Sequence, residues 1–172
     1  MIHEKEKQMS DRSFGWIKIG GMLRRRHIRK LAVAIELDAG KPDVGTAALT
    51  TKKAIALIEA ASGAGQPLRL IAEEADGGEL DAVETACRDL GLSFAAGWDP
   101  GDEYPEGARF FSPAESFSYG TSGGYAAFTV DELRHLLDGG QKFEEGLARL
   151  ATIHDKLQGT GLVLNVLDDG EA

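Results

Sequence analysis

The sequence has little of what exported and membrane proteins require. Cys87 is the only cysteine among the 172 residues, so no disulfide forms within the chain and no cysteine cluster binds zinc. The longest apolar runs, such as residues 31–35 and 54–58, fall far short of the about 18 residues that span a bilayer. The start, residues 1–7, is charged where a signal peptide is apolar. We therefore expect a cytoplasmic protein that does not contact a membrane.

Aromatic and basic residues are also scarce. Aromatic side chains make up 7% of the chain, and 19 basic residues stand against 28 acidic ones, which gives a net charge of −9 and a pI near 4.9. A field of this sign repels phosphate on average, so the protein is not a general nucleic-acid coat. The 22 glycines follow no fixed period, which excludes a collagen-like chain.

The length of the chain suits one hydrophobic core. We expect a flexible N-terminal tail over residues 1–13, one globular domain over residues 14–168, and an acidic C-terminal tail over residues 169–172. Met9 precedes the first ordered-looking segment, so a translation start at Met9 is an alternative to one at Met1.

Apolar periodicity predicts that strands and helices alternate through the domain. The expected strands cover residues 14–19, 68–72, 92–96, 108–112, 116–119, 125–129 and 161–167. The expected helices cover residues 22–37, 50–61, 79–90, 129–138 and 141–158. These elements predict an α/β or α+β fold, with one mixed sheet of about six strands and four to five packed helices.

The middle of the chain gives the most specific expectation about topology. A strand at residues 68–72, a helix at residues 79–90 and a strand at residues 92–96 follow one another closely. This order and spacing are typical of a βαβ unit, whose two strands are parallel and joined by a right-handed crossover.

Charge is distributed unevenly along the chain. Residues 1–30 carry a net charge of +6 and the remainder carries −15. On a helix over residues 22–37, the side chains opposite the apolar arc would be Arg25, Arg26, Arg29 and Lys30, whereas Arg24 falls inside that arc.

This basic helix face, within residues 24–30, has two interpretations. It would bind phosphate or an acidic partner, or it would be a solvated face that offsets the acidic remainder through contacts in the fold or between subunits. We favour the second, because the aromatic platforms on which nucleic-acid bases stack are missing.

Ser122 lies in the string Gly120-Thr121-Ser122-Gly123-Gly124, which matches the G-x-S-x-G pattern of a hydrolase nucleophile. That pattern requires a helix directly after the serine, and the residues that follow here are typical of a strand. A glycine-rich hairpin turn is the preferred interpretation.

An acidic group, Glu73, Glu74 and Asp76, follows the strand at residues 68–72. Carboxylates at the carboxyl end of a strand would hold Mg²⁺, but acids there are also common as solvated loop residues. Because no metal-ligand or nucleotide-binding spacing is present, we expect no metal and no cofactor.

These observations favour a non-catalytic interaction protein that self-associates as a homo-oligomer or binds a protein partner. The first alternative is a nucleic-acid-associated protein that uses the basic helix face. The second is a small hydrolase or metal-dependent enzyme that uses Ser122 or the group Glu73, Glu74 and Asp76.

Overall fold

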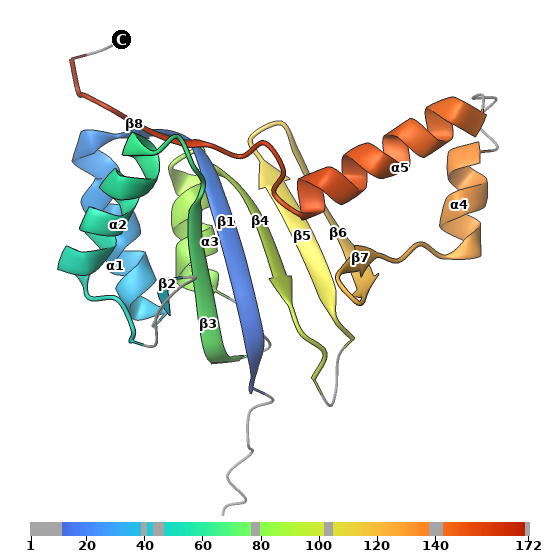
Figure 1. Ribbon diagram of the computed structural model, residues 1–172, viewed down its shortest axis with the longest axis horizontal. Coiled ribbons are helices and arrows are strands. Elements are labelled where there is room, and N and C mark those ends of the chain that lie inside the picture. The colour runs from blue at the N-terminus through green and yellow to red at the C-terminus, as the bar shows by residue number, and fades with distance from the viewer. Residues whose placement is uncertain are drawn as a thin grey trace, which may run out of the picture.

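The computed structural model describes residues 12–38, 41–42, 47–76, 80–101, 105–137 and 143–170, which form a mixed α+β fold (Figure 1). The strands are β1 (Arg12–Arg24), β2 (Lys41–Pro42), β3 (Leu68–Asp76), β4 (Ser93–Trp98), β5 (Gly107–Ser112), β6 (Glu115–Ser122), β7 (Tyr125–Ala126) and β8 (Leu164–Leu167). The helices are the short 3₁₀ turn η1 (Arg25–His27), α1 (Ile28–Leu37), α2 (Thr51–Gly63), α3 (Asp81–Asp89), α4 (Val130–Leu137) and α5 (Phe143–Leu157). The predicted tail at residues 1–13 lies mostly outside the described residues, and β1 begins at Arg12.

The sheet is antiparallel over seven strands, in the order β2-β3-β1-β4-β5-β6-β7, and β8 pairs in parallel with β1. The predicted parallel βαβ unit is wrong. β3 and β4 do not pair with each other, because β1 lies between them and is antiparallel to both. The spacing of strand, helix and strand along the chain does not show that β1, which comes earlier in the sequence, lies between β3 and β4 in the sheet.

β1 is longer than the sequence predicts. Gly20 and Gly21 do not end the strand, and it continues to Arg24 alongside β8. A Cβ atom at Gly20 would lie 2.9 Å from the backbone nitrogen of Val163, and Gly21 has a φ of +113°. The two glycines therefore let the chain before β8 approach β1 closely, and the predicted helix at residues 22–37 begins only with η1.

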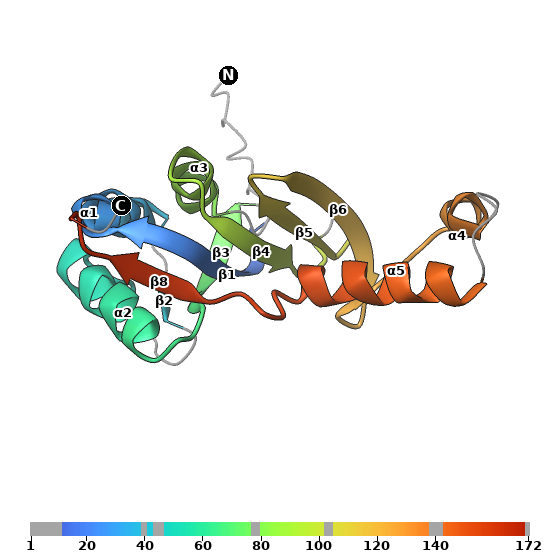
Figure 2. The same ribbon diagram turned by 90° about the horizontal axis from the view of Figure 1, so that it is seen from above.

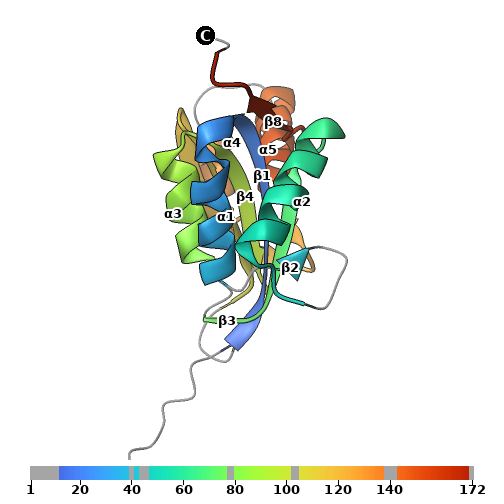
Figure 3. The same cartoon turned by 90° about the vertical axis from the view of Figure 1, so that its left-hand side faces the viewer.

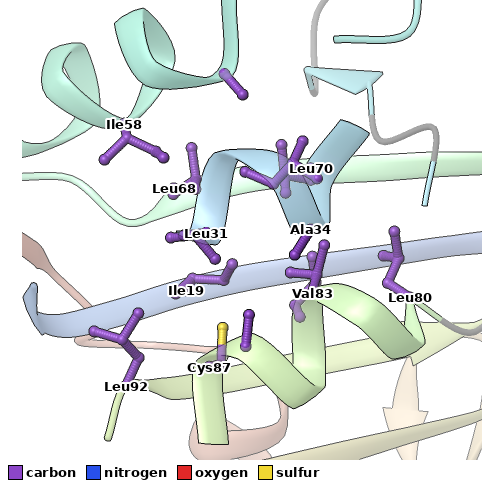
Figure 4. Close-up of a cluster of buried hydrophobic side chains, with 14 of the residues drawn as sticks. Ile19, Leu31, Ala34, Ile58, Leu68, Leu70, Leu80, Val83, Cys87 and Leu92 are labelled. Carbon is purple, nitrogen blue, oxygen red and sulfur yellow. The ribbon is translucent and has the colours of Figure 1, made fainter. Parts of the chain in front are cut away.

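One face of the sheet carries the main hydrophobic core, and we call it the core face. Cross-strand pairing places Ile17 beside Leu70 and Ala96, and Ile19 beside Leu68 and Phe94. The apolar sides of α1, α2 and α3 pack on these residues, as Figure 4 shows for Leu31, Ile58, Val83 and Cys87. In Figure 3, α1 lies between α2 and α3.

The opposite face, which we call the arm face, carries Trp16, Ala95, Ala108 and Phe110. The C-terminal half of α5 covers part of it, and Leu157 is buried there. From this contact α5 runs across β5 and β6 and continues past the edge of the sheet to α4 (Figures 1 and 2). We call α4 and α5 together the arm.

Among the described residues, no helix is both long enough and apolar enough to cross a membrane.

Candidate functional site

The basic segment that the sequence singled out is exposed, but its cations are partly neutralised within the chain. Arg25 Nε donates to Asp168 Oδ1 at 2.6 Å, and Arg25 Nη1 lies 3.3 Å from Glu59 Oε1. The hydrogen bond and the charge of Asp168 raise the pKa of Arg25 above its ordinary value. Lys30 Nζ lies 2.7 Å from Asp89 Oδ2.

Arg26 and Arg29 complete the predicted basic face. Arg26 Nε donates to His27 Nε2 at 3.2 Å, and Arg29 is exposed on α1. Arg25 and Arg26 belong to η1 rather than to the helix, so the four side chains do not share one helical face. The internal pairs of Arg25 and Lys30 favour charge balance within the fold over phosphate binding.

Ser122 ends β6, and the following residues turn the chain directly into β7. Gly123 and Gly124 have φ values of +58° and +81°, and Ser122 pairs with Tyr125 across the hairpin. The residue string is thus a strand-turn-strand hairpin, and the strand-turn-helix geometry of a hydrolase nucleophile is not present. The imidazole of His154 stacks on the Tyr125 ring at 5.8 Å, while the side chain of His135 lies outside the described residues.

The predicted acidic group lies on β3. Glu73 is exposed, and the side chains of Glu74 and Asp76 lie outside the described residues. Within the described part of the chain, no group of three or more His, Cys, Asp or Glu residues is arranged to hold a metal ion.

The structure brings together three charged residues that the sequence interpretation did not connect. Glu84 on α3 is only 2% exposed, and its two carboxylate oxygens meet two guanidinium groups. Arg109 of β5 lies 2.7 Å from Oε1, and Arg88 of α3 lies 3.1 Å from Oε2. Burial raises the pKa of Glu84 above its ordinary value, and the two arginines oppose this rise. We call these three residues the arginine cluster.

A sequence signal for part of the arginine cluster exists. Glu84 lies four residues after Leu80 and three before Cys87, on the apolar side of α3, where an acid requires a partner. Arg88, at the i+4 position, supplies one partner. Arg109 belongs to another element, and only the folded sheet brings it near.

A second unpredicted feature is the outer edge of β6. β7 pairs with Thr121 and Ser122, and the Gly120 carbonyl accepts from the Ala127 N–H just after β7. Among the described residues, positions 115–119 of β6 are therefore paired on one side only, with β5. In an antiparallel pair, successive residues alternate between bonding to the partner and pointing away from it. Because the Thr121 N–H donates back to the Glu106 carbonyl, the outward positions are Ser116 and Ser118.

The arm lies next to this open edge. Along α5, Leu157 is 1% exposed on the sheet, Leu150 is half-buried, and Leu147 is 49% exposed beyond the edge. On α4, Val130 is 64% exposed. The apolar stripe that anchors α5 to the sheet thus continues past β6, where no described strand lies beneath it (Figure 2).

Comparison with known proteins finds no matching family model, no matching curated protein and no matching solved structure.

Proposed function

We propose that this protein is a non-catalytic docking protein that binds an extended segment of a partner protein as an additional strand on β6. The open edge of β6 supports this proposal more than any other observation. Its outward N–H and C=O groups at Ser116 and Ser118 match the hydrogen-bonding pattern of a further strand.

The composition of β6 supports docking at this edge. Proteins protect edge strands from unwanted pairing with lysine, proline, bulges or very short length. β6 has eight residues, pairs with β5 in an unbroken register, and contains neither lysine nor proline. Glu115 is its only charged residue, and it pairs with Lys156 of α5.

The overhang of α5 indicates what the added strand contributes. Side chains of a strand alternate between the two faces of a sheet, so every second residue of the segment would lie under α5. Leu147 and Leu150 offer apolar surface there, and burying it against apolar side chains would stabilise the complex.

Charge on the arm favours a basic segment. At the ends of α4 and α5 beyond the sheet, the described charged residues are Asp131, Glu132, Arg134, Glu144, Glu145 and Arg149. Four are acidic and two are basic, and Arg134 lies 3.5 Å from Asp131. A partner segment that alternates apolar and basic residues therefore complements the site.

A partner chain suits these observations better than a second copy does. Self-association through the opposite charges of the N-terminal region and the remainder would need free cations. Arg25 and Lys30 already pair with acids of their own chain. A basic segment from another protein has no such competing contact.

The proposal is tested with a short alternating Lys-Val peptide and NMR of the amide groups. We expect the peptide to shift the amide signals of Ser116, Ser118 and Gly120, and an alternating Glu-Val peptide to bind at least about tenfold more weakly. A Lys-Val peptide with methylated backbone nitrogens controls for charge attraction alone, because it lacks the N–H groups of a strand.

The variant pair Ser118→Pro and Ser118→Ala separates edge pairing from other contacts. Proline removes one outward N–H without removing a bond to β5, whereas alanine keeps that N–H. We expect Ser118→Pro to weaken peptide binding about tenfold and Ser118→Ala to change it little. Equal binding by both variants would overturn edge pairing. A dimer whose Ser116 and Ser118 amides are protected without peptide would identify a second copy as the occupant instead.

A further inference from the structure

The arginine cluster lines a groove on the core face, separate from the arm. In the described part of the chain, α3 covers the core face only as far as β4, which leaves the same face of β5 and β6 without a helix (Figure 2). The groove there has a volume of about 360 Å³, and its lining includes Arg88, Trp98, Arg109, Phe111, Ser116 and Ser118.

The groove holds its guanidinium groups in fixed positions. The Arg88 guanidinium carbon lies 5.2 Å from the centre of the Phe94 ring and 5.4 Å from that of Phe111. The Arg109 guanidinium carbon lies 5.2 Å from the Trp98 ring. Stacking on aromatic rings and hydrogen bonding to Glu84 restrict both side chains, so little conformational entropy remains to be lost when an anion binds.

The positive charge of Arg88 favours an anion. Among the described residues, both oxygens of Glu84 are engaged by guanidinium groups, Oε1 by Arg109 and Oε2 by Arg88. Only one nitrogen of Arg88, Nη2, contacts Glu84, and the Arg88 side chain is 45% exposed at the groove. Replacing a buried ion pair by apolar residues is often neutral or stabilising, so stability alone does not require this arrangement.

Hydroxyl groups complete the lining. Ser118 is the cross-strand partner of Arg109, and Ser116 is the partner of Phe111, so both serines share the core face with the arginines. Both serine side chains are exposed. Their hydroxyl groups can donate hydrogen bonds to an oxygen that Arg88 also contacts.

We propose that this groove binds a small-molecule oxyanion, a carboxylate or a phosphate attached to a planar apolar group. Arg88 and the two serine hydroxyl groups contact the oxyanion, and Trp98 and Phe111 contact the planar group. This ligand site is independent of the proposed strand docking, which uses the backbone edge of β6 and the arm face.

Titration with benzoate and with phenyl phosphate, followed by NMR, tests the site and separates the two anions. The chain has two tryptophans, Trp98 in the groove and Trp16 on the arm face, so the indole signal of Trp16 is an internal control. We expect at least one anion to shift the signals of the Trp98 indole and the Ser116 and Ser118 amides. Neutral benzamide should leave them in place, and the tighter anion identifies the oxyanion.

Arg88→Gln should weaken anion binding at least fivefold, whereas Arg149→Gln, a matched change on the exposed side of α5, should leave it unchanged. Because Arg88 also supports Glu84, Ser118→Glu is a second variant, which retains all three residues of the arginine cluster. Its carboxylate would face the groove and should abolish binding. The proposal is overturned if neither anion shifts the groove signals, or if binding persists in Ser118→Glu.

Discussion

Asp38 links two helices that lie far apart in the sequence. It follows α1, yet its carboxylate accepts hydrogen bonds from the backbone N–H groups of Ala82 and Val83, at 3.3 and 2.9 Å, in the first turn of α3. The N-cap residue of α3, Leu80, has no side chain that accepts such bonds. Asp38 therefore does for α3 what an N-cap residue usually does within one helix.

We expect Asp38→Ala to lower the free energy of unfolding by about 1 kcal/mol, the usual cost of a lost helix cap. The two bonds reach different oxygens of Asp38, so Asp38→Asn keeps only one of the two acceptors and should lose less stability than Asp38→Ala. Urea denaturation of the three proteins measures the difference, and equal midpoints would show that Asp38 does not stabilise α3.

Glu84 predicts a pH dependence of defined sign. Burial raises its pKa in the folded protein above the ordinary value of 4.5. The folded state then binds the carboxyl proton of Glu84 more tightly than the unfolded chain does. The free energy of unfolding of the natural protein therefore falls as pH rises from the ordinary pKa of Glu84 through its raised value.

Glu84→Gln replaces the carboxyl group with an amide that does not titrate. The free energy of unfolding of the natural protein, relative to that of Glu84→Gln, should therefore decrease as pH rises from about 4 towards about 7. Urea denaturation of both proteins across this range measures the difference. A difference that is constant, or that grows with pH, would contradict the raised pKa.

At the scale of single elements, local signals in the sequence predict where helices end better than they predict how long strands are. Thr50 caps α2, with its hydroxyl accepting from the Lys53 N–H at 3.5 Å, and Gly91, with a φ of +66°, follows the end of α3. The predicted end of β1 is wrong because two successive glycines, at residues 20 and 21, are typical of a turn. In this fold they allow β1 to contact a segment about 140 residues away, and the local sequence does not encode that contact.

Gly20 is therefore the position in β1 where a methyl group should be least tolerated. In Gly20→Ala the new Cβ would press on the backbone of Val163, and we expect a loss of about 1–3 kcal/mol in the free energy of unfolding. Gly63→Ala is the matched control, because nothing lies within 4 Å of its added Cβ and alanine favours the helix. Similar stability of the two variants in urea would contradict the close approach of β1 and the chain before β8.

A capping box forms at the start of α4. The Thr129 hydroxyl accepts from the Glu132 N–H at 3.2 Å, and Glu132 Oε2 accepts from the Thr129 N–H at 2.7 Å. This backbone bond lowers the pKa of Glu132. The stabilisation is present above the ordinary carboxyl pKa and is lost as pH falls through the lowered value.

Hydrogen exchange of the α4 amides measures this effect. We expect protection in α4 to decrease as the solution becomes more acidic than about pH 4, after correction for the intrinsic exchange rate. Thr129→Ala should show lower protection already at neutral pH, with α2 as the unaffected reference helix. Unchanged α4 protection in Thr129→Ala would show that the capping box does not hold this helix.

At the scale of the whole molecule, the sequence predicts an α/β or α+β fold with four to five helices, and the described residues form an α+β fold with five α-helices. It does not predict the position of β1 between β3 and β4. The same limit applies to the candidate sites. Arg88 and Glu84 are close in the sequence, whereas Arg109 joins them from β5 only after the sheet has formed. The open edge of β6 depends on how little of β7 pairs with it, and hydrophobic periodicity does not encode strand neighbours.

The charge distribution of the intact protein predicts its state in solution. Because Arg25 and Lys30 pair within the chain, we expect a monomer by light scattering at both low and high salt. Arg25→Gln should leave the molecular mass unchanged. A dimer at low salt that dissociates at high salt would restore electrostatic self-association, the interpretation that we set aside.

The position of β1 has a consequence for the kinetics of folding. β1 is bonded to β3 and β4 from the middle of the chain and to β8 near its far end, and the Arg25–Asp168 pair beside β8 spans 143 residues. Such long-range contacts give a high contact order, which is typical of folding in milliseconds to seconds rather than microseconds. Closing so long a loop costs chain entropy that only a nearly complete sheet offsets. We therefore expect the parallel pairing of β1 with β8 to be the last part of the sheet to form during refolding.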